Sequence, residues 1–200
     1  MKRIALILAM GTLVLLPAAL FAQKDHGEVG AYADYFRFNP GGGTASNFIG
    51  VGGRAAFNVS PMVAIEAEMN YDFARDYTST YSTGTSAGGS TTLVTSSVRP
   101  LTGLFGPKFQ TRGPFKVFAT GKVGFIDFSV NNSGAVTGTG ATNAVAGVGG
   151  SGTHLAVYPG GGIEGFFGPI GLRAEAGDEI YFDNGTYNNL RVTFGPTIRF

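Results

Sequence analysis

The chain has 200 residues, 14 of them basic and 13 acidic, and it contains 33 glycines and no cysteine. The near balance of charge, without a basic patch or run, excludes electrostatic nucleic-acid binding. The lack of cysteine excludes disulfides and thiolate metal sites. The length fits one domain, and glycines without a collagen-like period indicate many turns and curved strands.

The first 22 residues predict a cleaved signal peptide. Lys2 and Arg3 are basic, residues 4–16 are almost wholly apolar, and residues 17–22 are suited to cleavage after Ala22. The apolar run falls short of the roughly 20 residues that a membrane-spanning helix needs. We therefore expect an exported protein whose mature domain, residues 23–200, carries 12 basic and 13 acidic residues.

Apolar and polar residues then alternate with a period of two, which predicts strands and no amphipathic helix. The clearest case is residues 63–73, where Val63 and Ile65 alternate with Glu66 and Glu68. Eight strands are predicted, at residues 28–38, 49–59, 63–73, 101–110, 115–125, 154–166, 170–179 and 190–200.

The connections between these strands alternate in length. They are short at residues 60–61, 112–114 and 168–169, long at 39–47, 74–97 and 129–152, and moderate at 182–188. Gly-, Ser- and Thr-rich composition in the two longest predicts mobile loops. Short periplasmic turns, longer outer loops and an even strand count are typical of a bacterial outer-membrane barrel with both termini in the periplasm.

The last strand places Leu190, Val192 and Phe194 on one face and Arg191 on the other, and the sequence ends on Phe200. An apolar face that ends on an aromatic residue in mid-strand is typical of the strand that closes an outer-membrane barrel. We expect Phe200 to be the C-terminal assembly signal, through which this strand engages the barrel-assembly machinery.

Three C-terminal segments carry a resemblance to a known family. They are Pro159–Glu164 (PGGGIE), Ile170–Glu175 (IGLRAE) and Asn189–Gly195 (NLRVTFG), the last running into the terminal Arg199 and Phe200. Together they resemble the last three strands of the small OmpA/OmpX-like outer membrane protein β-barrel domain family. The resemblance implies an all-β, eight-stranded antiparallel up-and-down transmembrane β-barrel in the bacterial cell outer membrane, and implies no single function.

The inward faces of the predicted strands collect four acids and four bases. These form a predicted lumen ion network: Arg54, Glu66, Glu68, Lys122, Glu164, Arg173, Glu175 and Arg191. Hairpin register predicts Arg54 opposite Glu66 and Glu164 opposite Arg173. An eight-stranded barrel is just wide enough for side chains to fill it, so we expect a plugged polar lumen whose charges are structural. A gated small pore or a proton path is the functional alternative.

Outward aromatic residues near the strand ends predict the two interfacial girdles of a membrane barrel. They are Tyr35, Phe57, Tyr71, Phe73, Phe109, Phe115, Phe125 and Tyr181. A soluble β-fold, with the apolar face inside, is the alternative, because periodicity alone does not distinguish inside from outside.

Signals for catalysis and cofactors are weak. Glu66 and Glu68 could perturb each other, but a neighbouring arginine favours a structural role. Only His26 and His154 could act as imidazole bases, and His154 has an alanine two residues later where lipid A deacylase barrels have serine. Asp127 or Asp183 could pair with His154 at the rim, as in outer-membrane proteases.

Two distant histidines and no cysteine do not make a metal site. The run Gly160–Gly162 lacks the helix and the Gly-Lys-Ser/Thr ending of a phosphate loop, and we expect glycine there to accommodate tight barrel curvature or a large facing side chain. We therefore expect no enzyme, no cofactor and no metal.

The leading functional hypothesis is a structural role in envelope integrity, or adhesion through the loops at residues 74–97 and 129–152. A narrow diffusion or transport channel is the alternative, and a rim enzyme acting on lipid or peptide is the second alternative. The expected partners are outer-membrane lipid and the barrel-assembly machinery, with an unidentified surface-loop ligand, and the protein is expected to be a monomer.

Overall fold

The computed structural model describes residues 26–39, 45–83, 90–133 and 151–200. The predicted signal peptide and most of the predicted loop at residues 129–152 lie outside these ranges. The described residues form nine strands: β1 (Gly27–Phe38), β2 (Ser46–Ser60), β3 (Val63–Asp72), β4 (Arg75–Thr83), β5 (Ser90–Gln110), β6 (Phe115–Ser133), β7 (Gly152–Phe167), β8 (Ile170–Phe182) and β9 (Thr186–Arg199).

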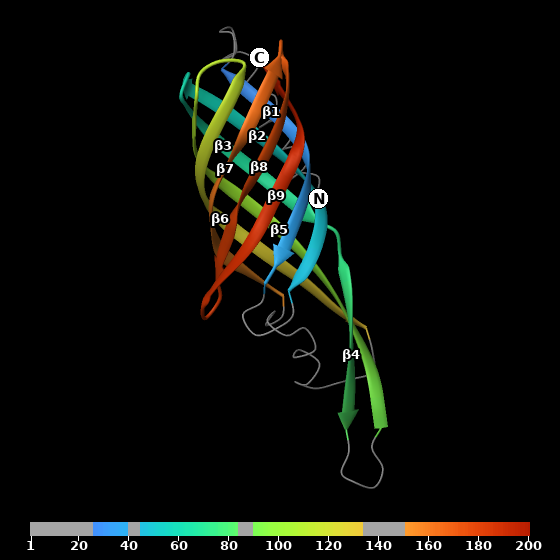
Figure 1. Ribbon diagram of the computed structural model, residues 1–200. Coiled ribbons are helices and arrows are strands. Elements are labelled where there is room, and N and C mark those ends of the chain that lie inside the picture. Colours follow the sequence, from blue (N-terminus) through green and yellow to red (C-terminus); the bar gives the residue numbers. More distant parts are fainter. Residues whose placement is uncertain (1–25, 40–44, 84–89, 134–150) are drawn as a thin grey trace, which may run out of the picture.

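Eight of these strands close into an antiparallel barrel, in the order β1-β2-β3-β5-β6-β7-β8-β9 (Figure 1). β9 pairs back onto β1, with Glu28 opposite Arg199. At this seam Gly27 and Phe200 exchange two backbone hydrogen bonds of 2.9 Å each. The predicted fold class, strand number and direction of the strands are confirmed.

The ninth strand corrects the prediction of a mobile loop at residues 74–97. β3 ends at Asp72 and β4 begins at Arg75, and β4 pairs with the first half of β5 from Arg75 opposite Val98 to Thr83 opposite Ser90. This β4–β5 hairpin projects beyond the barrel (Figure 1). Thr, Tyr and Val favour strands, and here that preference outweighs a composition that resembles a loop.

The two ends of the barrel differ as predicted. One end carries the β2–β3, β5–β6 and β7–β8 turns, and we call it the turn end. Gly113 and Gly168 adopt positive φ there, 113° and 66°, which glycine tolerates without strain. The opposite end, the loop end, carries the β4–β5 hairpin and the β8–β9 turn.

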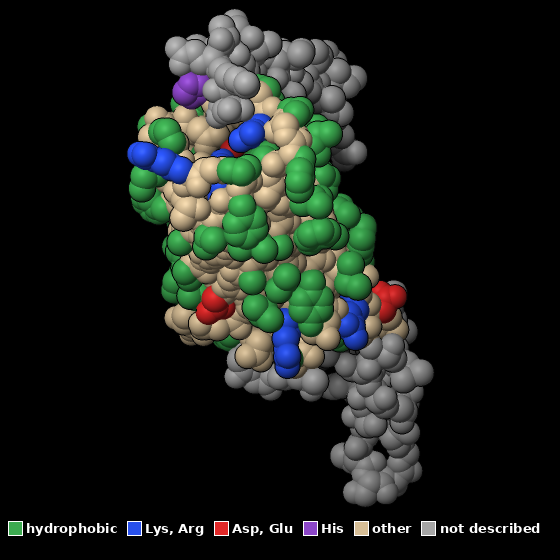
Figure 2. Space-filling view, turned by 45° about the horizontal axis from the view of Figure 1, so that its top comes forward, with side chains coloured by type: hydrophobic (Ala, Val, Ile, Leu, Met, Phe, Trp, Pro, Cys, Tyr) green, Lys and Arg blue, Asp and Glu red, His purple; other side chains and the backbone are tan. Residues whose placement is uncertain are grey.

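The outer surface of the barrel is apolar around its middle (Figure 2). Phe105, Phe115 and Phe194 are more than half exposed, at 57, 59 and 58%. Six of the predicted outward aromatics are exposed: Phe57, Tyr71, Phe73, Phe109, Phe115 and Phe125. A surface of this kind is stable against lipid tails and not against water, which excludes the soluble alternative.

Two glycines on β7 make room for inward aromatic rings, as predicted for this run. A Cβ on Gly160 would lie 2.7 Å from the Tyr158 ring, and a Cβ on Gly162 would lie 2.8 Å from Phe118. Because glycine has no side chain, the neighbouring aromatic rings have room to fill the narrow lumen. In the described ranges, no helix is long and apolar enough to cross a membrane.

Candidate functional site

The barrel interior is the candidate site, because charged side chains from nearly every strand converge in it. Its central cluster surrounds the ammonium group of Lys122 on β6. Lys122 Nζ lies 2.7 Å from Glu66 and from Glu68, both on β3, and 2.9 Å from Glu175 on β8. β3 and β8 lie on opposite walls of the eight-stranded barrel, and β6 lies between them, so these contacts tie the walls together across the lumen.

Two guanidinium groups complete the central cluster. Arg173 contacts Glu66 and Glu175 at 2.5 Å each, and Arg54 donates to Glu175 at 3.1 Å and to Thr193 at 3.0 Å. The central cluster thus consists of three acids and three bases: Glu66, Glu68, Glu175, Arg54, Lys122 and Arg173. Because every charge has an opposite charge in contact, the cluster is stable despite its burial.

A second group of charges, the turn-end cluster, consists of Glu28, Lys108, Lys116 and Glu164. Lys108 Nζ lies 2.9 Å from Glu28 and 3.3 Å from Glu164, and Lys116 Nζ lies 3.2 Å from Glu28. Asn58 also donates to Glu28 at 3.0 Å. This cluster spans the lumen near the turn end.

A third group, the loop-side cluster, places one base among three acids. Arg191 on β9 contacts Asp34, Asp72 at 3.4 Å and Glu179 at 2.5 Å, and Thr102 accepts a further hydrogen bond at 3.2 Å. All three acids are at most 2% exposed. The described acidic residues of the lumen outnumber its basic residues by two, and this excess lies in the loop-side cluster.

Aromatic rings cover the flat faces of the cations. Arg173 lies over Phe118 at 4.1 Å, Arg54 over Tyr32 at 4.2 Å and Arg191 over Phe36 at 4.4 Å, measured to the ring centroids. Cation–π contacts of this kind are worth about 2 kcal/mol when desolvated. The rings therefore fill the space between the charge clusters while also stabilising them.

All eight residues of the predicted network are buried in the barrel. The prediction missed six further buried charged residues, which stand on the same inward face of their strands: Glu28, Asp34, Asp72, Lys108, Lys116 and Glu179. The period of two already contained this signal, since Glu28 and Asp34, like Glu179, stand an even number of positions from other inward residues of the same strand. Among the described residues the interior holds eight acids and six bases.

One predicted register is confirmed and the other is wrong. Glu164 does lie opposite Arg173, although its carboxylate contacts Lys108. Arg54 lies opposite Glu68, and Glu66 lies opposite Ala56, because the register shifts between Asn58 and Ser60. The extra residue of this bulge moves the turn away from Ser60 and changes every pair above it.

Glu66, Glu68 and Glu175 approach one another closely enough to share a cation. Lys122 supplies that cation from within the chain, since its ammonium contacts all three carboxylates. The geometry is therefore that of an internal ion cluster, in which an ammonium group of the chain occupies the place between the three carboxylates.

An aromatic layer fills the lumen on the loop side of the charges. Phe36, Phe38, Phe48, Phe128 and Tyr181 are all at most 2% exposed. Phe38 packs against Phe128 and Tyr181, with ring centroids 5.3 and 6.0 Å apart. The prediction that Tyr181 faces lipid is wrong, because Tyr181 lies on the same inward face of β8 as Arg173, Glu175 and Glu179. The lumen is therefore only partly polar.

Of the two aspartates predicted to pair with His154 at the rim, Asp183 lies near its ring. His154 Nδ1 lies 3.8 Å from Asp183 Oδ1, while Asp127 accepts a 2.6 Å hydrogen bond from Thr153. The His154 ring packs between Phe128 and Tyr181, at 6.1 and 5.9 Å. At 3.8 Å the two atoms lie beyond hydrogen-bond distance.

Comparison with known proteins supports the fold. No family model matches the chain, and no curated protein matches it. The crystal structure of Ail, the attachment invasion locus protein of Yersinia pestis, matches with 12% identity and a TM-score of 0.56, over 89% of this chain and 100% of Ail. Neisserial surface protein A matches with 12% identity and a TM-score of 0.51, over 87% of this chain and 97% of its own.

The structural neighbours are small eight-stranded outer-membrane barrels. The resemblance predicted from the C-terminal segments is thus confirmed for the fold. At 12% identity the likeness extends no further than the fold.

Proposed function

We propose that this protein is an outer-membrane barrel with a closed interior, whose role is structural and which attaches the cell to surfaces through its loop end. The filled lumen carries this proposal. Three charge clusters and an aromatic layer occupy the interior in succession, so a solute would have to break several buried ion pairs to pass. A buried charge left without its partner costs about 3–5 kcal/mol when the partner is removed by mutation.

The β4–β5 hairpin is the element proposed to make contact. A paired hairpin holds its backbone in place beyond the barrel, so less conformational entropy is lost on binding than with a mobile loop. The sequence of residues 74–97 contains only two charged residues, Arg75 and Asp76, and is rich in Ser, Thr and Tyr. We therefore propose that it binds neutral polar surfaces through hydroxyl groups.

The structural neighbour Ail supports attachment but suggests a different ligand. Its name includes attachment, and it was crystallised with the heparin analogue sucrose octasulfate. A sulfated ligand requires clustered cations, and the hairpin of this chain has a single arginine next to an aspartate. Attachment is thus the shared proposal, and polyanion binding is not carried over.

The remaining parts of the proposal concern export and assembly. A signal peptide at residues 1–22 would direct the chain across the inner membrane, and Phe200 would mark the last strand for the barrel-assembly machinery. Outer-membrane lipid is the proposed surrounding, and the monomer is the proposed state, since the pairing of β1 with β9 closes the eight-stranded barrel on itself.

Shortening the hairpin tests the proposal. Residues 77–96 are replaced by Asn-Gly, a two-residue hairpin turn, and cells that display this variant are compared with wild type for attachment to glycan-coated surfaces. Surface labelling and a heat-dependent gel shift in SDS establish equal display and folding. In the matched control, Asp183–Gly185 of the β8–β9 turn is replaced by the same dipeptide. We expect the hairpin variant alone to lose attachment, and full attachment without the hairpin would refute the proposal.

A further inference from the structure

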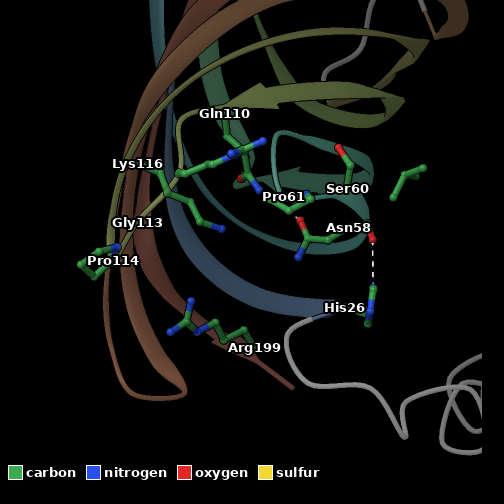
Figure 3. A pocket seen from close by; sticks show the side chains of 11 residues that line it. His26, Asn58, Ser60, Pro61, Gln110, Gly113, Pro114, Lys116 and Arg199 are labelled. Atoms are coloured by element: carbon green, nitrogen blue, oxygen red, sulfur yellow. Dashed lines mark hydrogen bonds between the residues drawn. The ribbon is translucent and has the colours of Figure 1, made fainter.

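The turn end of the barrel opens into a cavity of about 610 Å³, which we call the vestibule. Its walls come from the start of β1, the β2–β3 turn, the β5–β6 turn and the end of β9. Figure 3 shows the side chains of Lys116 and Arg199 extending into the opening, with Asn58 and His26 on the other side. A cavity of this size holds a small molecule or a lipid headgroup.

The lining of the vestibule is cationic. Arg112, Lys116 and Arg199 contribute to it, and none of its lining residues is an acid. Glu28, the acid in contact with Lys116, is shared with Lys108, which lies 2.9 Å from it. Arg112 lies exposed in the β5–β6 turn and makes no ion pair with another described residue. The vestibule therefore has a surplus of positive charge.

One polar atom in the vestibule is buried without a partner. Gln110 is 6% exposed, and its Nε2 donates to Asn58 Oδ1 at 3.2 Å. Gln110 Oε1 has no hydrogen-bond partner. An orphaned buried acceptor costs about 1–3 kcal/mol. A ligand that brings a hydroxyl group would satisfy this oxygen.

We propose that the vestibule binds a glycerophosphate group. The phosphate, with several oxygens, can contact Arg112 and Lys116 together, and a glycerol hydroxyl can donate to Gln110 Oε1. The turn end lies at the headgroup level of the inner leaflet if the barrel spans the membrane as proposed. The group could therefore belong to an anionic phospholipid headgroup or to a soluble glycerophosphate, which share this chemistry.

The test uses the full-length protein in detergent, with two probes that separate the sources. sn-Glycerol 3-phosphate is titrated by calorimetry, and dioleoyl phosphatidylglycerol is titrated by native mass spectrometry with dioleoyl phosphatidylcholine as the neutral comparison. Arg112→Gln removes a cation from an exposed turn, so the barrel still folds. The matched control is Arg37→Gln, an exposed arginine at the loop end.

We expect Arg112→Gln to weaken binding about tenfold, the effect of losing one charge-assisted contact, and Arg37→Gln to leave it unchanged. An Arg112-dependent signal from sn-glycerol 3-phosphate supports the site with a soluble ligand. A signal only from phosphatidylglycerol supports the site with a lipid headgroup. The absence of Arg112-dependent binding in both titrations overturns the proposal.

Discussion

Glu66 lies at the middle of the central cluster, where three cations approach its carboxylate. The distances are 2.5 Å to Arg173, 2.7 Å to Lys122 and 3.9 Å to Lys108. Glu66→Ala would leave these cations buried with one partner fewer, so we expect the free energy of unfolding to fall by about 3–5 kcal/mol. Urea unfolding in lipid vesicles measures the change. Asp76→Ala, at an exposed site, is the control with no expected change, and an equal midpoint for both variants would contradict the ion network.

Lys122 offers the reverse test of the same cluster. Lys122→Ala would leave Glu66, Glu68 and Glu175 together without their shared ammonium. Their oxygens lie within 4.8 Å of one another, which suits a hard cation that binds carboxylates. We expect the variant to be less stable than wild type in EDTA and to recover stability when folded in Ca²⁺. Wild type, measured in parallel, should not respond to Ca²⁺, and a variant equally insensitive would show that the three acids do not act as a unit.

Parity in the sequence predicted which way the charged residues point, but it did not predict their partners. Arg54 illustrates the limit, since its contacts are Glu175 and Thr193, on β8 and β9, and not a residue on the adjacent β3. Strand alternation is a local property, whereas contacts across a lumen depend on how the whole sheet is rolled. The turn bulge near Ser60 likewise follows from local backbone geometry that an alternating pattern does not encode.

At the scale of the element, β2 carries adjacent glycines with opposite surroundings. A Cβ on inward Gly52 would overlap the ring of Tyr32, whose hydroxyl donates to Asn70 at 2.6 Å, while a Cβ on Gly53 finds only Gly30 O at 3.8 Å. We expect Gly52→Ala to lower the free energy of unfolding by about 1–3 kcal/mol through overpacking. Gly53→Ala, one residue away, is the matched control and should fold as wild type. Equal unfolding curves for the two variants would show that Tyr32 can move aside at little cost.

The β4–β5 hairpin shows why the prediction of elements was incomplete. The eight barrel strands were predicted from their alternation, because the face toward lipid must be apolar and the face toward the lumen is mostly polar. The base of the hairpin touches the core through Tyr77 and Val98, but the hairpin then projects beyond the barrel (Figure 1), so its sequence has a weaker constraint and resembles a loop. Only β-propensity and the continuous pairing of β5 with β6 extend the sheet there.

For the whole molecule, the sequence predicted the barrel correctly, because closing eight strands requires the same alternation in each of them. The predicted polar lumen was only half right, since the loop side is packed with Phe36, Phe38, Phe128 and Tyr181. Aromatic residues occur on both faces of these strands, and composition alone does not assign them. The charge network and the aromatic layer fill the interior between the vestibule and the loop end, and this filling has a measurable consequence.

A dense interior predicts that the intact barrel does not conduct ions. Protein that shows the heat-dependent gel shift of a closed barrel is reconstituted in a planar bilayer at about 1 M salt, where surface charges are screened and only the lumen limits flow. We expect no steady conductance from wild type, with a porin in the same bilayer as the positive control. Phe38→Ala combined with Phe128→Ala thins the aromatic layer while leaving all three charge clusters in place, and this variant should also stay closed. Steady currents through wild type would favour the channel alternative, whereas currents through the double variant alone would place the barrier in the aromatic layer and not in the ion pairs.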